Sequence, residues 1–217
     1  MRTIKVTGRG ELKLRPDLTR VTAALSGKYG EYAETLERSS ADTEKLKDML
    51  ASFGFERAGV KTVDFSVDAE YESRQEDGEY RQKLAGYRYR HTVKVEFEPD
   101  NERLGKLLHA LAASDLEPEF TVAYTVKDPE KARGELLAKA VADAREKAEI
   151  LARSAGLTLK EIASVDYSYG GADAFVRPTA RMAAFKAADA QSFAFGADMN
   201  PDDVNVSDAV TVVWETV

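Results

Sequence analysis

Two stretches of this 217-residue chain, 63–72 and 87–97, alternate between apolar and polar side chains almost without interruption. A period of two is the pattern of a strand that buries one face. Clean alternation is typical of antiparallel sheets covered on one side, because strands of a buried parallel sheet read as continuous apolar runs. The dipeptide Asp77-Gly78 lies between the two stretches and predicts a hairpin with a two-residue turn.

An uninterrupted ladder from this turn would place Val67 opposite Arg88, an apolar residue against a charged one. A half-buried sheet does not tolerate this, because a slip of one residue moves every following side chain to the other face. One extra residue in one strand restores the pairing, and glycine inside a strand often marks such a bulge. We therefore predict a bulge at Ala85-Gly86 that brings Val67 opposite Tyr89.

The same reasoning predicts helices at 31–53, at 101–113 and between Asp128 and Gly156. Asp128 suits the N-cap of the last helix, and Gly156 suits the position just past its end. The remaining elements are strands, at 2–14, 18–27, 63–72, 87–97, 119–126, 159–167 and 209–217. The order ββ-α-ββ-α-β-α-ββ predicts an α+β fold with antiparallel sheets covered by helices. We expect a single domain over 1–217, or two intertwined halves, 1–98 (ββαββ) and 99–217 (αβαββ).

The stretch 170–203 is predicted to be a long loop. Loops of this length are uncommon in compact domains and are usually functional or disordered. Disordered linkers are polar, whereas this one contains large apolar side chains: Phe175, Met182, Phe185, Phe193, Phe195 and Met199. We expect these six residues to contact the body of their own chain or a neighbouring subunit.

Alanine recurs at every fourth position from Ala140 to Ala152 on the last helix, and Leu137, Val141, Leu151 and Ala155 extend this stripe. Small side chains let a helix approach its neighbour closely. We expect the stripe to lie tightly on its own sheet; in the alternative, part of it meets another subunit. Gly8 and Gly10 lie inside a strand, not between a strand and a helix, so they indicate a bulge or a close backbone approach instead of a phosphate-binding loop.

No group of residues has the spacing of a catalytic or metal site. His91 and His109 are the only histidines, whereas a metal site usually needs three or more ligands and a hydrolytic triad needs an acid and a nucleophile as well. We interpret both as structural histidines and expect no catalytic residue, no cofactor and no metal. The basic residues between Arg81 and Lys94 are the strongest nucleic-acid candidate, but cross-strand acids absorb their charge. With a net charge of −7 we expect no nucleic-acid partner.

The sequence contains no cysteine, which excludes disulfides, thiolate metal sites and thiol switches. No stretch approaches the roughly 18 apolar residues of a transmembrane helix. The first residues have neither the apolar run nor the small-residue cleavage site of a signal peptide, so we expect a cytoplasmic protein.

Four segments, in order, resemble SIMPL-domain proteins. They read VTGRGELKLRPDLTRV, LAGYRYRHTVKVEF, AVADAREKAEILARSAGLTLKEIASV and VSDAVTVVWE. The resemblance implies a bacterial envelope or cytosolic protein with distant animal relatives that bind an innate-immunity kinase. It also implies links to oxidative-stress defence and a large ring- or channel-like homo-oligomer, as at least one member forms. It implies no established catalytic residue or cofactor. Many members are periplasmic or exported, and 170–203 matches the family only loosely.

We therefore expect a non-enzymatic protein that assembles with copies of itself through sheet edges and 170–203, with a possible link to stress defence. Two alternatives remain open. One is a small-ligand-binding protein or an enzyme whose pocket is lined by tyrosines, namely Tyr71, Tyr87, Tyr89, Tyr124, Tyr167 and Tyr169. The other is an adaptor that binds a client protein.

Overall fold

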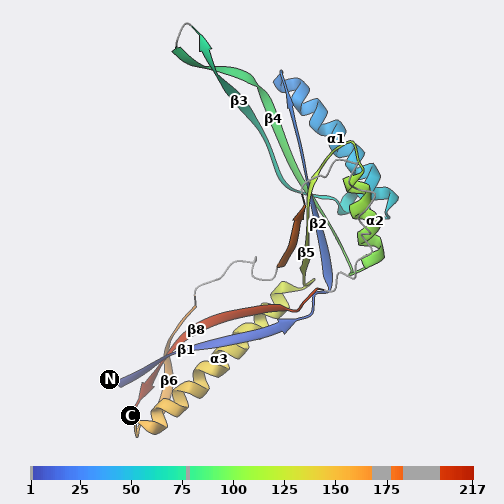
Figure 1. Ribbon diagram of the computed structural model, residues 1–217. Helices are drawn as coiled ribbons and strands as arrows, with labels where there is room; N and C mark the ends of the chain where they lie inside the picture. Colours follow the sequence, from blue (N-terminus) through green and yellow to red (C-terminus); the bar gives the residue numbers. More distant parts are fainter. Residues whose placement is uncertain (1, 77–78, 168–176, 183–200) are drawn as a thin grey trace. The chain divides into compact units, whose positions relative to one another are not determined.

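The structure is a computed structural model that describes residues 2–76, 79–167, 177–182 and 201–217 (Figure 1). Its fold is α+β with antiparallel sheets, as predicted. The elements in chain order are β1 (Arg2–Leu14), β2 (Leu18–Tyr29), α1 (Tyr32–Ser52), the 3-10 turn η1 (Arg57–Gly59), β3 (Lys61–Glu76), β4 (Glu79–Phe97), α2 (Asn101–Ala112), β5 (Glu119–Thr125), α3 (Pro129–Ser154), β6 (Leu159–Asp166), β7 (Arg177–Met182) and β8 (Val204–Thr216). Of these, η1 and β7 were not predicted.

Strand β7 corrects our expectation that 170–203 is a loop throughout. It lies next to β5 at one end of a five-stranded sheet. Its sequence, RPTARM, does not alternate between apolar and polar residues, so it carries no strand signal. A proline is tolerated here because an edge strand has one side without ladder partners.

The chain divides into two compact units, each described here by itself. Unit 1 consists of Met1–Asp17, Thr125–Arg177 and Pro201–Val217, and unit 2 of Leu18–Tyr124 and Pro178–Asn200. Unit 1 contains α3 and a three-stranded sheet in the order β1-β8-β6; unit 2 contains α1, α2 and a five-stranded sheet in the order β3-β4-β2-β5-β7. Strands β1 and β8 pair along their whole length. Unit 1 therefore cannot form until distant parts of the chain have come together.

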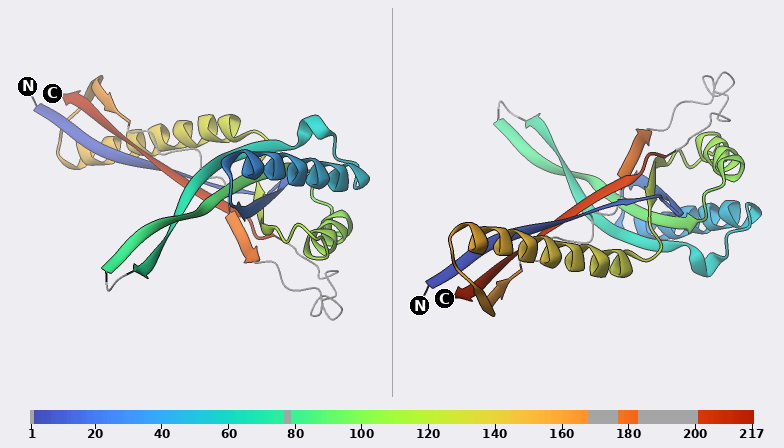
Figure 2. Two further views of the ribbon diagram at one scale, coloured as in Figure 1. Left: turned by 90° about the horizontal axis from the view of Figure 1, so that it is seen from above. Right: turned by 90° about the horizontal axis from the view of Figure 1, so that it is seen from below.

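In unit 1, α3 runs along β1 and β8 (Figure 2). The helix comes very close to β1 at two glycines. A Cβ atom on Gly8 would lie 2.1 Å from the carbonyl oxygen of Ala140, and one on Gly10 would lie 2.1 Å from that of Leu136. Atoms do not approach each other so closely, so only glycine fits at either position. The close backbone approach and the tight packing of the alanine stripe on its own sheet are both confirmed.

The stripe is narrower than predicted. Its alanines are buried, from Ala140 to Ala152, but Val141 and Leu151 are 40% and 51% exposed and Ala155 is exposed as well. Residues four apart drift by about 40° around a helix, so a ridge built on this spacing winds across the sheet. Residues of α3 beside this ridge, such as Val141 and Leu151, then lie outside the contact between the helix and the sheet.

Side chains of α3 also provide partners for the free edge of β1. The backbone N–H of Arg9 donates to Oδ2 of Asp143 at 2.7 Å, and Lys139 Nζ donates to the carbonyl oxygen of Glu11 at 3.4 Å. Lys147 Nζ contacts the same Asp143 oxygen at 2.7 Å, and these bonds from Lys147 and Arg9 lower the pKa of Asp143. An edge strand whose backbone groups are occupied is a poor template for pairing with another chain.

In unit 2, the hairpin of β3 and β4 contains the predicted bulge. The ladder skips Ala85, and Gly86 has a φ of 131°, which few residues other than glycine adopt. Beyond the bulge Val67 lies opposite Tyr89, as predicted. The apolar face of this ladder is therefore continuous across the irregularity.

A second bulge, which we did not predict, lies at Val63. Thr62 pairs with Val93, whereas Asp64 pairs with the residue directly before Val93. The extra residue moves the side chains before it to the other face of the sheet. The side chain of Thr62 therefore shares a face with those of Val93 and His91. No glycine or proline marks this position in the sequence.

The core of unit 2 lies between its sheet and both helices. Strands β2, β4 and β5 supply one side of the core. The leucines of the helices supply the other: Leu46 and Leu50 on α1, and Leu104, Leu107, Leu108 and Leu111 on α2. The sheet face toward the helices is the one that carries Tyr89 and Val93 in β4.

The predicted helix ends are confirmed. Helix α1 ends before Gly54, whose φ is 79°, and α3 ends before Gly156, whose φ is 67°. The carboxylate of Asp128 accepts a hydrogen bond from the backbone N–H of Lys131 at 2.9 Å and caps α3. The helices that the structure describes are too short or too polar to span a lipid bilayer.

We expect Gly8→Ala to lower the free energy of unfolding by about 2 kcal/mol or more, because the new methyl group would overlap backbone atoms of α3 that cannot turn away. Gly134→Ala is the matched control. Nothing lies within 4 Å of a Cβ atom there, so this variant should be more stable by about 0.5–1 kcal/mol. Urea unfolding followed by circular dichroism measures both. A Gly8→Ala protein as stable as the wild type would contradict the close contact.

Candidate functional site

A hollow of about 390 Å³ lies on unit 2 between α1 and the edge strand β3. Its lining combines three hydroxyl side chains of α1, one of β3, a histidine, an ion pair and two apolar walls: Ser39, Ser40, Thr43, Thr62, His91, Glu44, Lys47, Leu36 and Phe65. A neutral imidazole among hydroxyl groups is a potential base beside potential nucleophiles. This hollow is therefore the candidate site.

Two larger hollows have no histidine in their described lining. One, of about 790 Å³ on unit 2, contains Arg103, whose guanidinium carbon lies 4.0 Å from the centroid of the Phe55 ring. The Nε of Arg103 also donates to the carbonyl oxygen of Phe53 at 3.1 Å. The other, of about 620 Å³ on unit 1, is lined by Lys13, Lys139 and neighbouring strand residues. In the described lining of both, no imidazole lies beside a hydroxyl group.

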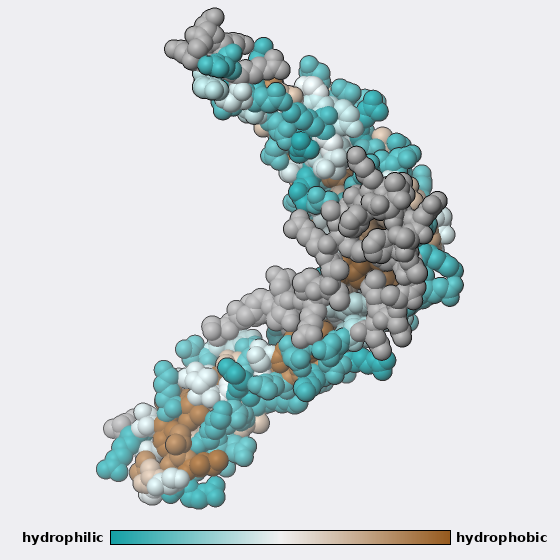
Figure 3. Space-filling model, viewed as in Figure 1, coloured by the Kyte–Doolittle hydropathy of each residue, from teal (hydrophilic) through white to brown (hydrophobic). Residues whose placement is uncertain are grey.

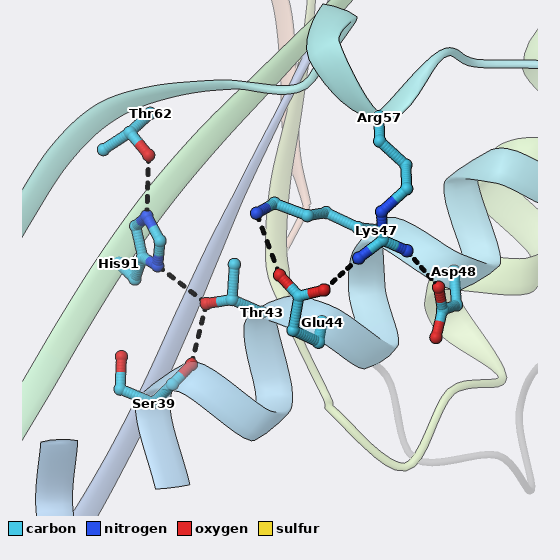
Figure 4. Close-up of polar contacts among 8 residues, drawn as sticks. All are labelled: Ser39, Thr43, Glu44, Lys47, Asp48, Arg57, Thr62 and His91. Carbon is cyan, nitrogen blue, oxygen red and sulfur yellow. Dashed lines mark hydrogen bonds and ion pairs between the residues drawn. The ribbon is translucent and has the colours of Figure 1, made fainter. Parts of the chain in front are cut away.

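Both ring nitrogens of His91 have hydroxyl partners (Figure 4). Nδ1 lies 2.8 Å from Oγ1 of Thr43 on α1, and Nε2 lies 2.9 Å from Oγ1 of Thr62 on β3. The Thr43 hydroxyl in turn donates to the carbonyl oxygen of Ser39 at 2.7 Å. The ring nitrogens of His91 thus have satisfied hydrogen bonds. That its role is purely structural, as we interpreted it from the sequence, stays a prediction.

These contacts determine where the protons are. A threonine hydroxyl has one hydrogen, and that of Thr43 is used for Ser39, so Thr43 can only accept from Nδ1–H of His91. In a neutral ring Nε2 then carries no hydrogen and accepts the hydroxyl hydrogen of Thr62. Burial, and to a smaller degree the charge of Lys47, lowers the pKa of His91, so the neutral ring is the form present at pH 7.

An ion-pair network borders the site on α1 (Figure 4). Lys47 Nζ contacts Oε1 of Glu44 at 3.0 Å, and Arg57 of η1 pairs with both Glu44 and Asp48. These pairs hold η1 against α1. Because β3 begins directly after η1, they also fix the start of the strand that carries Thr62.

Sequence reasoning did not select Thr43 or Thr62. A signal for Thr43 existed, since Ser39 and Thr43 are polar residues on the helical face that also carries Leu46 and Leu50, and all four are buried. A buried hydroxyl needs a hydrogen-bond partner. No comparable signal existed for Thr62, because its position depends on the bulge at Val63.

The apolar residues that the sequence marked as contacts cannot be placed in this site. Met182 is the last residue of β7. The others, Phe175, Phe185, Phe193, Phe195 and Met199, lie outside the described residues.

None of the described tyrosines belongs to the lining of these hollows, and Tyr169 lies outside the described residues. Tyr89 and Tyr124 are 1% and 2% exposed and belong to the core of unit 2, where Tyr89 donates to Asp42 at 2.7 Å. Tyr71 is 62% exposed on the hairpin. Tyr167 belongs to unit 1 and donates to Asp208 at 2.9 Å. A tyrosine-lined pocket therefore has no support among these hollows.

Three basic residues in the second half of β4 are paired with acids. Arg88 contacts Glu70, and Arg90 contacts Glu119 at 3.5 Å. Lys94 contacts Glu96 at 3.2 Å. Cross-strand and neighbouring carboxylates thus absorb much of this charge, as the bulged register predicts.

Two comparisons with known proteins bear on identity. The sequence model of the SIMPL family, described as a protein of unknown function (DUF541), matches residues 4–214. The uncharacterized protein YggE of Edwardsiella ictaluri (strain 93-146) is 26% identical over 164 residues, which cover 76% of this chain and 67% of that protein. Neither description states an activity.

The lowered pKa of His91 predicts a dependence of stability on pH. The unfolded chain, with its ordinary pKa near 6.5, binds a proton before the folded site does. Stability that is present above this value is therefore lost as the pH falls below it. We expect His91→Gln to lose less stability than the wild type between about pH 7 and pH 5, measured as urea midpoints at each pH.

The matched control is His109→Gln, which changes an exposed histidine at the end of α2. It should follow the wild type over the same pH range. If His91→Gln also followed the wild type, the neutral ring of His91 would not be a requirement of the fold.

Proposed function

Because the chain belongs to the SIMPL family, whose biochemical function is unknown, we propose that it is a non-enzymatic protein that assembles with copies of itself. The support is an apolar surface that unit 1 leaves uncovered. Helix α3 packs mainly on β1 and β8 and hardly touches β6. The side of the sheet formed by β6 consequently has no cover from α3.

Two register shifts in β6 turn apolar side chains to the face of the sheet on which α3 packs. They lie beyond the part of that face that α3 covers. Ile162 pairs with Trp214 and Val165 pairs with Val212, although the β6 residues are three apart and the β8 residues two apart. Trp214 and Val212 are buried against α3, so Ile162 and Val165 share their face of the sheet. Yet Ile162 and Val165 are 52% and 55% exposed. This is the observation that carries the proposal.

Helix α3 adds to the apolar surface of unit 1. Ile150 and Leu151, in its last turns, are 52% and 51% exposed. Figure 3 shows apolar surface over the end of unit 1 where β6 lies. Exposed apolar surface that is concentrated in one region is typical of an interaction site.

Unit 2 has exposed apolar residues of its own, on the hairpin. Val63, Phe65, Tyr71 and Leu84 are between 45% and 62% exposed, and β3 is the edge strand of its sheet. A chain with two separate contact surfaces can join two neighbours, which an assembly larger than a pair requires. We include the apolar residues of 170–203 as further contacts and treat 1–217 as one domain in this proposal.

The test is light scattering on the purified chain. We expect the wild type to have a mass that is a multiple of the chain mass, and Ile162→Lys/Val165→Lys to be a monomer, because burying two unpaired ammonium groups would oppose association. Val141→Lys is the matched control, an exposed apolar residue of the same unit that lies on α3, and it should assemble normally. A monomeric wild type at high concentration would contradict self-assembly and favour the client-binding alternative.

We extend the proposal to stress defence, which the family resemblance motivates. A strain without this protein should survive peroxide less well than its parent. Wild-type protein and Val141→Lys should restore survival, and Ile162→Lys/Val165→Lys should not. If all three proteins restored survival equally, stress defence would not depend on assembly.

A further inference from the structure

We propose that Thr62 is an acyl-acceptor site, whose hydroxyl takes an acyl group from an activated ester, thioester or acyl phosphate with His91 as the base. This inference does not depend on the β6 surface, since the site lies in unit 2 and β6 in unit 1. Phe65 is common to the site and to the hairpin surface of unit 2. It begins from the direction of one hydrogen bond. The hydroxyl of Thr62 donates to an unprotonated Nε2 at 2.9 Å, which is the ground-state contact between a nucleophile and its base.

The ring that acts as base is held by Thr43 and Phe65. Thr43 accepts from Nδ1–H at 2.8 Å and is itself anchored to the helix backbone at Ser39. The ring of Phe65 lies edge-to-face with the imidazole, with centroids 5.2 Å apart and an interplanar angle of 79°. The tautomer and the ring orientation are thus fixed before any substrate arrives, which is the role that the third group of a catalytic triad plays.

The contact between Thr62 and His91 depends on an irregularity in β3. In an unbroken ladder Thr62 would lie on the polar face with Asp64 and away from His91. The bulge at Val63 turns Thr62 to the imidazole. Bulges often serve to redirect a side chain in this way beside active sites.

The hydroxyl is also accessible. Thr62 is exposed, and it lines the hollow together with Leu36 and Phe65, which are 37% and 46% exposed. These apolar walls suit the hydrocarbon part of a small acyl donor. A volume of about 390 Å³ accommodates an aryl ester or the acyl end of a thioester.

The step balances in atoms and charge. Oγ1 of Thr62 forms a bond to the carbonyl carbon of the donor while its hydrogen passes to Nε2 of His91. The bond from that carbon to the leaving group then breaks, and the leaving group departs as a phenolate, thiolate or phosphate. The proton on His91 passes to the leaving group or to water, and Thr62 is left as an ester.

The environment of His91 limits the reaction to activated donors. Among the described residues, the hydrogen-bond partners of its ring are hydroxyl groups and not a carboxylate. The imidazolium formed in the step therefore lacks the charged partner of a triad. Hydrolysis of the ester would expel the Thr62 alkoxide, a much poorer leaving group than a phenolate. Loading is consequently faster than release, and the acyl group accumulates on the chain.

The experiment incubates the full chain with p-nitrophenyl acetate and maps acetylated peptides by mass spectrometry. Hydroxylamine removes esters but leaves acetyl-lysine, so it distinguishes Thr62 from lysines. An internal reference is Thr7, a strand threonine whose hydroxyl is hydrogen-bonded to another hydroxyl, that of Thr211, at 2.9 Å. We expect ester on Thr62 at least about tenfold above Thr7, since a positioned general base contributes about 10²–10⁴-fold.

Variants identify the groups responsible. His91→Gln should reduce labelling of residue 62 to the level of Thr7, and Thr62→Val should remove the ester, whereas Thr62→Ser should keep it. Thr43→Val should slow labelling and Thr43→Ser should keep it, because serine retains the hydroxyl that accepts from Nδ1–H of His91. Labelling confined to lysines, or equal ester on Thr62 in the wild type and His91→Gln, would overturn the proposal. If His91→Gln did not fold, the ratio of Thr62 to Thr7 in the wild type would decide it alone.

Discussion

What unit 1 presents to solvent depends on how closely α3 approaches β1. Without side chains at Gly8 and Gly10, the helix backbone rests on the strand backbone. The helix is therefore drawn toward the β1 side of the sheet, where Asp143 reaches the free N–H of Arg9. The opposite side, formed by β6, is left almost without cover from α3. The missing side chains at Gly8 and Gly10 thus account both for the contacts of α3 with the edge of β1 and for the exposed apolar residues of β6.

In unit 2 the arrangement around His91 depends on a different constraint. Buried polar groups need hydrogen-bond partners. Thr43 is 6% exposed, and its hydroxyl satisfies both the helix backbone and His91. That single hydroxyl determines the tautomer of the imidazole and, through it, the direction in which Thr62 donates. The polar network belongs to unit 2 and the apolar strand β6 to unit 1, so the acyl transfer and the assembly through β6 that we propose can be tested separately.

Local signals in the sequence predicted the fold wherever one side chain determines the backbone. Asp128, Gly54 and Gly156 marked helix ends, and the reversal of faces around Gly86 revealed the first bulge. The bulge at Val63 lies so near the start of β3 that a slip there changes the face of very few residues, and the pattern does not reveal it. The exposure of β6 could not be predicted either, because burial depends on where α3 comes to rest and not on the residues of the strand.

The closed edge of β1 has a consequence for how unit 1 can grow. A sheet that is open on both sides can add copies without end, as in a fibril. Here two backbone groups of the β1 edge are occupied by Asp143 and Lys139, which favours the addition of strands beyond β6. In the self-assembly that we propose, two units joined beyond β6 would leave only their β1 edges open. Edge-to-edge growth of this sheet would then stop at a pair and not continue as a fibril.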